Sequence, residues 1–508
     1  MGVPGLFGYC LKKFGNRIII KKLTTILLAS MAVMALSCQK NNDNEEGKFH
    51  PQTPEELPDK PEVIVKDGSF YVNGEPFFIK GAAINGDNLD SDGNQEFWKE
   101  AKQAGANTVR MYSVNNESIA FLDEMAKKGV YVNLGIGIAR ECEGFDYNDE
   151  NARKKQLSSV KSLIDKIADH PAILMWCIGN ELDQNKKVDG SGTISLNVNV
   201  WKDVNEISEY IHKNDGRPTT TALTGTWDKT ITEIKTYVPD IDLLCINAYD
   251  PGIYNVHSSL KSQSFDKPYI ISEFGPLGTW EAEVKKTEWG CMLESTGTEK
   301  AAAYKKLYDE CIVPYQGQGC LGSYVFLWGY QSHGDVLTWY AMFDQFQKQA
   351  LPAATAMSEL WTGAPAAKKN PVISAMTLEG KTADKNVKIP SATLASAQVS
   401  ASSPDGAALT YDWRIIRDVR LENGKTMSGI SGLIQGKPDQ NLSFKAPSKA
   451  GNYRLIVFVR DAANGLADMA VFPFNVTESG EGGGSEDLED GELGGESIDG
   501  WEKGHHIK

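Results

Sequence analysis

Two apolar segments of this sequence each end in a glutamate. The run ILMWCIGN is followed by Glu181, and the run YIIS is followed by Glu273. Two carboxyl groups can break a glycosidic bond, because one protonates the leaving oxygen while the other attacks the anomeric carbon or directs a water at it. A single glutamate in a loop is as readily a solvated surface group. The matched placement of two glutamates therefore predicts a catalytic pair.

The elements that would position this pair form a repeating pattern. Short apolar runs alternate with segments whose apolar residues recur every three or four positions, as in amphipathic helices. The runs fall at 77–83, 108–112, 130–135, 173–178, 219–223, 243–248, 269–272 and 322–327. The helical segments include 95–104, 117–128, 152–170 and 197–214. Strands buried on both faces that alternate with helices indicate a parallel sheet, and eight such units favour a (β/α)8 TIM barrel over a doubly wound sheet.

The active site of a TIM barrel lies where the strands run into the loops that follow them. Glu181 would end strand four and Glu273 would end strand seven, so both glutamates would reach the same rim. Other strands also end in side chains that could serve a site, namely Arg110, Asn180, Asn247, Tyr249 and Trp328.

These motifs carry a resemblance to known enzymes. Gly179-Asn180-Glu181 and the SEFG run at 272–275 look like the acid/base and nucleophile motifs of clan A glycoside hydrolases. The barrel resembles the catalytic domain of glycoside hydrolase family 2, and the runs FFIKG at 77–81 and NTVRMY at 107–112 are also similar to fungal β-1,3-glucanosyltransferases. The resemblance covers residues 68–363. It implies a retaining reaction with Glu181 as general acid/base and Glu273 as nucleophile.

The resemblance also implies roles for the neighbouring residues. Arg110 would orient the nucleophile and keep it ionised, and Asn180 would contact the sugar 2-hydroxyl. Tyr249 would donate a hydrogen bond to the nucleophile, and Trp328 would floor the −1 subsite. Asn247 occupies the place where family 5 members usually carry histidine, which favours the family 2 and glucanosyltransferase branch. A core phenol and a core indole are the alternative interpretations of Tyr249 and Trp328.

Tryptophans in the long loops could extend the site. Trp280 and Trp289 follow strand seven, and Trp339 follows strand eight. Aromatic faces stack on the apolar faces of pyranose rings, so these residues could form glycan subsites. Simple loop packing is the alternative for each of them.

A second domain follows the barrel domain, which we place at 63–363. Residues 364–371 resemble a linker, and short strand-like runs then fall at 387–389, 397–401, 409–416, 442–444, 453–460 and 468–476. This pattern predicts an immunoglobulin-like β-sandwich over 372–477, with Trp413 and Tyr453 in its core. The acidic, glycine-rich segment 478–508 should be disordered.

The pattern of the first 62 residues predicts that the protein is exported, and it predicts no folded domain in this segment. Basic residues precede the apolar run 23–36, which ends at Ser37-Cys38 and is too short for a membrane span. The segment 1–38 resembles a bacterial lipoprotein signal of the Bacteroides type, with Cys38 lipidated and 39–62 as a disordered tether to the outer membrane or cell surface. A cleaved signal that releases a soluble protein is the alternative. Further on, Asn73-Gly74 between two apolar runs predicts a β-hairpin before the first barrel strand.

Charge and cysteines narrow the range of partners. The formal charge of −15 argues against a nucleic-acid partner, because phosphate binding needs clustered Lys and Arg. The eight cysteines include no CxxC pair, so neither a zinc site nor a dense disulfide framework is expected. We expect no metal or organic cofactor, a monomeric protein, and membrane contact through the lipid alone.

Three functions are compatible with these residues. The first is a retaining β-glycoside hydrolase that acts on a β-linked glycan, with β-1,3-glucan as the best guess, by double displacement. The second is a transglycosylase in which a sugar hydroxyl replaces water at the same residues. The third is a non-catalytic surface glycan-binding lipoprotein, which has no chemical need for both carboxylates and their supporting residues.

Overall fold

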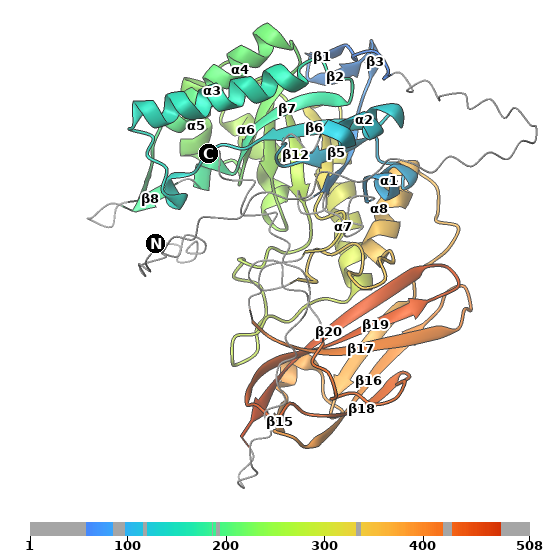
Figure 1. Cartoon of the computed structure of the whole chain (residues 1–508). Helices are drawn as coiled ribbons and strands as arrows, with labels where there is room; N and C mark the ends of the chain where they lie inside the picture. The colour runs from blue at the N-terminus through green and yellow to red at the C-terminus, as the bar shows by residue number, and fades with distance from the viewer. Residues whose placement is uncertain are drawn as a thin grey trace, which may run out of the picture. The chain divides into compact units, whose positions relative to one another are not determined.

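The structure is a computed structural model, and the residues that it describes belong to one compact unit (Figure 1). It describes residues 57–84, 97–114, 119–184, 186–188, 194–331, 337–419 and 429–478. Cys38 and most of the expected tether and acidic tail lie outside the described residues. No helix in the described part of the chain is both long enough and apolar enough to cross a bilayer.

Eight parallel strands close into a barrel in chain order, as the sequence predicts. They are β4 (Ile79–Ile84), β5 (Thr108–Met111), β6 (Tyr131–Ile136), β7 (Ile173–Asn180), β10 (Thr219–Leu223), β11 (Leu244–Asn247), β12 (Tyr269–Phe274) and β13 (Cys320–Val325). Each predicted strand overlaps one of these strands, and the ends differ by a few residues. The TIM-barrel prediction is therefore confirmed.

Helices cover the outside of the barrel. They are α1 (Phe97–Gln103), α2 (Ile119–Lys127), α3 (Glu150–Ile167), α4 (Asn199–Asn214), α5 (Asp228–Tyr237), α6 (Val256–Ser262), α7 (Gly297–Cys311) and α8 (Pro352–Thr362). In α4, Val200, Val204, Ile207 and Ile211 are buried at three- and four-residue spacing, which explains why this segment forms an amphipathic helix. Side-chain caps at Asp149 and Thr296 begin α3 and α7.

The barrel strands are apolar throughout because both of their faces are buried. In β7, Trp176 and Ile178 belong to the core between strands and helices, whereas Met175 and Cys177 belong to the core inside the barrel. Side chains alternate between the two faces along a strand, so a strand with two buried faces needs apolar residues at nearly every position. The interior is filled and leaves only the rim for a ligand.

A small sheet precedes the barrel. It consists of β1 (Val63–Lys66), β2 (Ser69–Val72) and β3 (Glu75–Pro76). Asn73 and Gly74 connect β2 to β3 with φ of 52° and 82°, the positive values that a two-residue hairpin turn requires. The predicted hairpin is confirmed.

Seven further strands form two sheets around a separate apolar core. One sheet contains β14 (Val372–Leu378), β16 (Leu394–Ser402) and β18 (Asn441–Lys445), and the other contains β15 (Lys388–Pro390), β20 (Leu466–Thr477), β19 (Gly451–Asp461) and β17 (Leu409–Arg417). Trp413 and Tyr453 are buried in the shared core, as expected. The sequence pattern missed β14, because its burial is irregular. The immunoglobulin-like classification stays a prediction.

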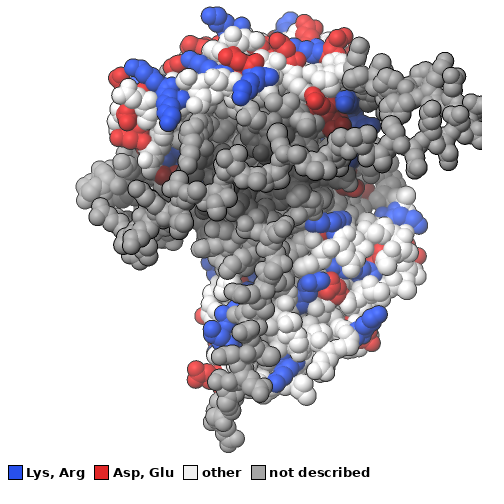
Figure 2. All heavy atoms as spheres, in the orientation of Figure 1, with Lys and Arg blue, Asp and Glu red and all other residues white. Residues whose placement is uncertain are grey.

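The described surface mixes charges of both signs. Figure 2 shows Lys and Arg interspersed with Asp and Glu on the visible face, without a broad basic area.

Candidate active site

The end of β7 presents Glu181 to the rim through two residues in the left-handed conformation. Gly179 has φ of 75° and Glu181 has φ of 54°, and the pairing of β7 with β10 shifts register at this point. A Cβ at Gly179 would lie 2.4 Å from Cδ1 of Leu182, so both the dihedral angle and the space require glycine. The amide of Glu181 still donates to the carbonyl of Ala222 at 2.8 Å. The glutamate is therefore fixed by its backbone while its side chain stays partly exposed.

Glu273, in β12, lies deeper and accepts four hydrogen bonds. Its Oε1 accepts from Arg110 Nη1 at 3.0 Å, from the hydroxyl of Tyr112 at 2.8 Å and from Asn247 Nδ2 at 2.8 Å. Its Oε2 accepts from the hydroxyl of Tyr249 at 2.7 Å. The residue is only 6 % exposed. Both carboxylate oxygens are thus oriented by protein donors before any ligand arrives.

Arg110 connects four barrel strands beneath the carboxylates. Besides Glu273, it donates to Asn247 Oδ1 at 3.0 Å, to the carbonyl of Ser272 at 2.8 Å and to Asn180 Oδ1 at 2.7 Å. The hydroxyl of Ser272 also donates to Asn247 Oδ1, at 2.7 Å. Because two donors occupy this oxygen, the amide nitrogen of Asn247 must point the other way, toward the carboxylates.

The amide nitrogen of Asn247 bridges the two glutamates. Nδ2 donates to Oε1 of Glu181 at 3.0 Å and to Oε1 of Glu273 at 2.8 Å. Two oxygens that accept from the same nitrogen cannot be further apart than the sum of the two donor–acceptor distances. The two Oε1 atoms of Glu181 and Glu273 are therefore less than about 6 Å apart. A bound of this size on the nearest oxygens is compatible with the ~5–5.5 Å between carboxyl groups of retaining glycosidases.

Burial and charge shift the ionisation of the groups around Glu273. Burial raises the pKa of Glu273 to about 6, and the nearby Glu181 adds to this, while Arg110, Tyr249 and Tyr112 act in the opposite direction. The pKa of the Tyr112 and Tyr249 phenols is also raised, by burial and by the charge on Glu273. Both phenols therefore remain donors at neutral pH, and the carboxylate ionises only above mildly acidic pH.

Two of the predicted tryptophans lie close to this cluster, in different environments. Trp280 is 51 % exposed, and its ring meets that of Tyr249 edge-on at 5.2 Å between centroids. Trp339 is buried beside Tyr249 and donates from Nε1 to the carbonyl of Leu277 at 2.9 Å. Trp280 thus offers an open face to a ligand, whereas Trp339 supports the loop that carries it.

Trp328, which follows the eighth barrel strand, is buried away from any ligand. Trp328 is only 1 % exposed and packs against Trp361 and Phe343 in the core between barrel and helices. This corrects the expectation that Trp328 floors a sugar subsite, because its indole has no face open to a ligand. Phe326, two residues earlier, contacts Tyr249 instead.

Trp289 lies in a segment that contacts the two sheets formed by strands β14 to β20. Its neighbour Glu288 forms an ion pair with Lys388, and the backbone amide of Glu288 donates to Asn386 Oδ1 at 2.8 Å. Cys291, two residues further on, contacts Asp418. These contacts tie its segment to the sheets that follow the barrel, and the expectation that the partly exposed Trp289 forms a subsite stays a prediction.

The same sheets hold the loop that follows β13. Arg460 of β19 donates to Asp344 at 2.8 Å, and both side chains are buried. Arg454 of β19 pairs with Glu294 at 3.6 Å, and Glu294 in turn accepts from the hydroxyl of Thr338 at 2.8 Å. Thr338 directly precedes Trp339, so the rim beside the carboxylates is braced by arginines from outside the barrel.

Sequence reasoning missed two contributors to the carboxylate cluster, Tyr112 and Ser272. A usable signal existed for Tyr112. Residues two apart on a strand share a face, so an arginine at 110 that points into the site implies that the side chain at 112 follows it. The role of Ser272 could not be read in this way, because it acts by orienting Asn247 from the adjacent strand.

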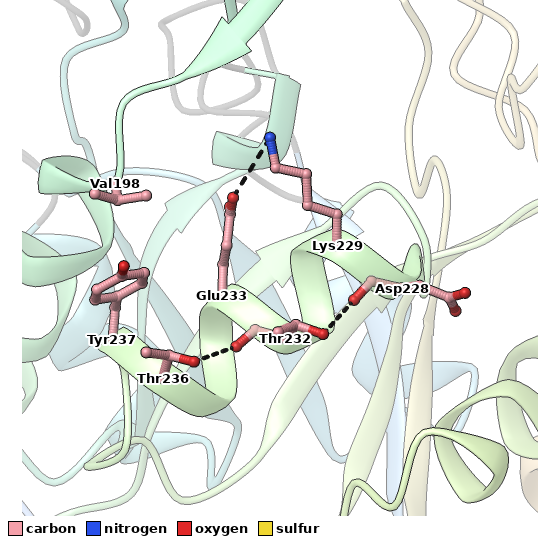
Figure 3. Close-up of a pocket in the computed structure, with 7 residues that line it drawn as sticks. All are labelled: Val198, Asp228, Lys229, Thr232, Glu233, Thr236 and Tyr237. Atoms are coloured by element: carbon pink, nitrogen blue, oxygen red, sulfur yellow. Dashed lines mark hydrogen bonds and ion pairs between the residues drawn. The ribbon is translucent and has the colours of Figure 1, made fainter.

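A surface pocket exists away from this cluster. It lies between α4 and α5 and is lined by Val198, Asp228, Lys229, Thr232, Glu233, Thr236 and Tyr237 (Figure 3). Its hydroxyl groups donate to helix carbonyls, and Lys229 pairs with Glu233 at 3.7 Å. Both threonine hydroxyls and the Lys229–Glu233 pair are thus engaged within the helix. In the described part of the chain, no three His, Cys, Asp or Glu side chains gather in a way that could hold a metal ion.

Comparison with known proteins points to enzymes that act on glycosidic bonds. Residues 55–275 match a family model described as glucanosyltransferase. The β-glucuronidase of Sus scrofa is 22 % identical over 233 residues, which are 42 % of this chain and 33 % of that protein. The β-galactosidase of Thermoanaerobacter pseudethanolicus is 25 % identical over 219 residues, which are 41 % of this chain and 25 % of that protein. The chain thus matches a third or less of these relatives' length.

Two solved structures share the fold at low identity. A β-glucuronidase from Bacteroides uniformis is 14 % identical, with 82 % of this chain and 48 % of that chain covered and a TM-score of 0.44. A variant of Gas2p from Saccharomyces cerevisiae, in complex with laminaritetraose and laminaripentaose, is 16 % identical, with 61 % and 68 % covered and a TM-score of 0.42. At these TM-scores neither structure bears on function. The family match and the relatives support a glycoside hydrolase or glucanosyltransferase of the TIM-barrel clan.

Substitution of Gly179 tests how the backbone presents Glu181. We expect Gly179→Ala to lower the free energy of unfolding by about 2 kcal/mol, because it adds a collision with Leu182 to the strain of a positive φ. Gly216→Ala is the matched control, since Gly216 has φ of 79° with open space around it and should lose only about 1 kcal/mol. Denaturant unfolding measures both variants, and equal losses would show that the contact with Leu182 is unimportant.

Proposed function

We propose that this chain is a retaining β-glycoside hydrolase that uses Glu273 as nucleophile and Glu181 as general acid/base. The observation that carries the proposal is the shared donor, Asn247 Nδ2, because it brings an oxygen of each carboxylate within one hydrogen bond of the same atom. This supports a closely spaced pair of the kind that double displacement uses. The unequal exposure of the two glutamates supports the same assignment. Glu273 is enclosed by donors, while Glu181 remains open to a leaving group and then to water.

The first step would form a covalent glycosyl-enzyme. An oxygen of Glu273 attacks the anomeric carbon as the bond from that carbon to the leaving oxygen breaks, and the proton of Glu181 passes to the leaving oxygen. Arg110 and the phenols of Tyr112 and Tyr249 keep the attacking carboxylate ionised and aimed. Asn180 accepts from Arg110 and Asn247 through its oxygen, which turns its amide nitrogen toward the position of a sugar 2-hydroxyl.

The second step would release the sugar. Glu181, now ionised, removes a proton from an incoming water, whose oxygen bonds to the anomeric carbon as the bond to Glu273 breaks. The configuration is inverted twice and so retained. Neither step requires a metal or an organic cofactor.

The substrate that we propose is a β-linked glycan, with β-1,3-glucan first. The glucanosyltransferase family match over residues 55–275 supports a glucan, while the curated relatives are named for glucuronides and galactosides. The same match favours one alternative, a transglycosylase in which a sugar hydroxyl replaces water in the second step. Both versions use the same residues, so the products formed from a chain distinguish them.

A panel of polymers tests the assignment of the two carboxylates. Wild type, Glu181→Ala and Glu273→Ala are compared on β-1,3-glucan, mixed-linkage glucan, mannan and galactan by reducing-sugar release and product chromatography. We expect wild type to cleave one polymer with retained anomeric configuration, Glu273→Ala to be at least ~10³-fold slower, and Glu181→Ala to recover most activity on a glycoside whose leaving group needs no proton.

Glu310→Ala is the control for this panel, because Glu310 is an exposed glutamate on α7 and should keep full activity. Inverted products would contradict double displacement. Glycan binding by wild type without any turnover would instead favour the binding-protein function.

The pKa of Glu273 predicts the pH dependence of the reaction. The nucleophile must be ionised, so kcat/KM should fall as the pH drops below about 6. Tyr249→Phe removes a hydrogen bond that lowers this pKa, so the acidic limb should move up by roughly one pH unit and kcat/KM should fall ~10–100-fold. Tyr254→Phe is the control, because Tyr254 is exposed and its hydroxyl donates to Glu310. An unmoved limb in Tyr249→Phe would show that another group sets it.

We also propose that the chain is a lipoprotein of the outer membrane or cell surface and that residues 372–477 form an immunoglobulin-like domain. The basic and apolar run before Cys38 supports lipid attachment. Metabolic labelling with palmitate should mark wild type and not Cys38→Ala, and equal labelling of the two would disprove attachment at this cysteine.

A further inference from the structure

Two tryptophans have unusually open indole rings. Among the described residues, Trp227 is 56 % exposed and Trp280 is 51 % exposed, and these are the only tryptophans among the exposed large apolar side chains. Tryptophan is normally well buried, because its large apolar surface costs free energy in water. Each of the two lies in the loop that follows a barrel strand, β10 for Trp227 and β12 for Trp280. Trp280 belongs to the site described above, whereas Trp227 has no role there.

The loop that carries Trp227 is fixed at several points. The amide and hydroxyl of Thr224 donate to the buried carboxyl group of Asp183, the hydroxyl at 2.6 Å. The carbonyl of Thr226 accepts from Ser259 of α6 at 3.2 Å and from Gln263, which caps the end of α6, at 2.8 Å. An exposed indole on a braced loop is preorganised, so binding a ligand there would cost little conformational entropy.

The indole itself is held at its edge and backed on one side. Nε1 of Trp227 donates to the hydroxyl of Thr224 at 3.4 Å. A Cβ at Gly225 would lie 3.2 Å from this nitrogen, so the glycine lets the ring lie close against the backbone. The opposite side of the ring is left for a ligand.

Trp227 stands on the side of the acid/base residue. Strand β10 pairs directly with β7, the amide of Glu181 donates to Ala222 of β10, and Asp183 follows Glu181 by two residues. Trp280, in contrast, contacts Tyr249, which donates to the nucleophile. The loops that carry the two open indoles are therefore joined to different glutamate segments, that of Trp227 to the segment of Glu181 and that of Trp280 to the surroundings of Glu273.

We propose that Trp227 forms a leaving-group subsite by stacking on a pyranose ring of a sugar chain. This inference rests on the proposed function, because the group that Glu181 protonates must leave on the side of Glu181. The apolar face of a pyranose ring matches the exposed face of an indole. The substrate is accordingly a glycan with sugar units on both sides of the cleaved bond, and small non-sugar leaving groups would make no use of Trp227.

The test compares substrates with and without a sugar in the leaving group. Wild type, Trp227→Ala, Trp227→Phe and Trp280→Ala are assayed on the polymer that wild type cleaves fastest and on the glycosyl fluoride of the same sugar. We expect Trp227→Ala to lose about tenfold in kcat/KM on the polymer and less than about twofold on the fluoride. Trp227→Phe should recover part of the loss, and Trp280→Ala should be impaired on both substrates.

The outcomes separate this subsite from the proposed function. Equal kinetics of wild type and Trp227→Ala on the polymer, or equal losses on polymer and fluoride, would overturn the subsite while the hydrolase stands. Wild type that cleaves no substrate is then run on polymer-containing native gels. Retardation that Trp227→Ala lacks would support glycan stacking without hydrolysis, and wild type that is neither active nor retarded would overturn both proposals.

Discussion

Arg110 and Glu273 carry opposite charges inside the barrel, where neither is solvated by water. Their side chains are 1 % and 7 % exposed and lie 3.0 Å apart. A buried charge is costly unless it is paired and hydrogen-bonded, and here each partner supplies the opposite charge, although Nε of Arg110 is buried without a hydrogen-bond partner. Asn247, Ser272 and the tyrosines complete the network. Arg110 is the cation of this network, and it opposes the burial that raises the pKa of Glu273.

The pair explains why the chain needs a closed barrel. Arg110 lies on β5, while its partners come from β7, β11 and β12, strands that are not adjacent to β5 and that it reaches across the inside of the closed barrel. The filled interior forms a rigid floor beneath them, and Arg454 and Arg460 brace the rim from β19. The two sheets formed by strands β14 to β20 therefore contribute to the shape of the site through ion pairs, without supplying a residue to the carboxylate cluster.

Two glutamates of the same chemistry are given different environments. Glu273 is buried among donors and ionises near pH 6, whereas Glu181 sits on a strained turn at the rim, where a proton can be exchanged with a ligand. The two exposed indoles are divided in the same way. Trp280 packs against Tyr249, which donates to Glu273, whereas Trp227 follows β10, the strand that pairs with β7 and so with the segment of Glu181. Such a division suits a reaction in which one side of the bond stays on the enzyme and the other leaves.

The sequence by itself determined the barrel, its eight strands and the two glutamates, because alternating strands and helices leave a periodic signal and strand ends converge in a parallel barrel. It also placed Arg110, Asn180, Asn247 and Tyr249 at the rim. Only the tertiary structure decided which aromatic rings face solvent. Trp328 and Trp227 both follow the end of a barrel strand in the sequence. In the structure, the ring of Trp328 is packed against Trp361, whereas the ring of Trp227 is exposed to solvent. The exposure of a ring depends on packing between segments that are far apart in the chain. The same holds for Ser272 and for the arginines of β19, whose partners no local pattern reveals.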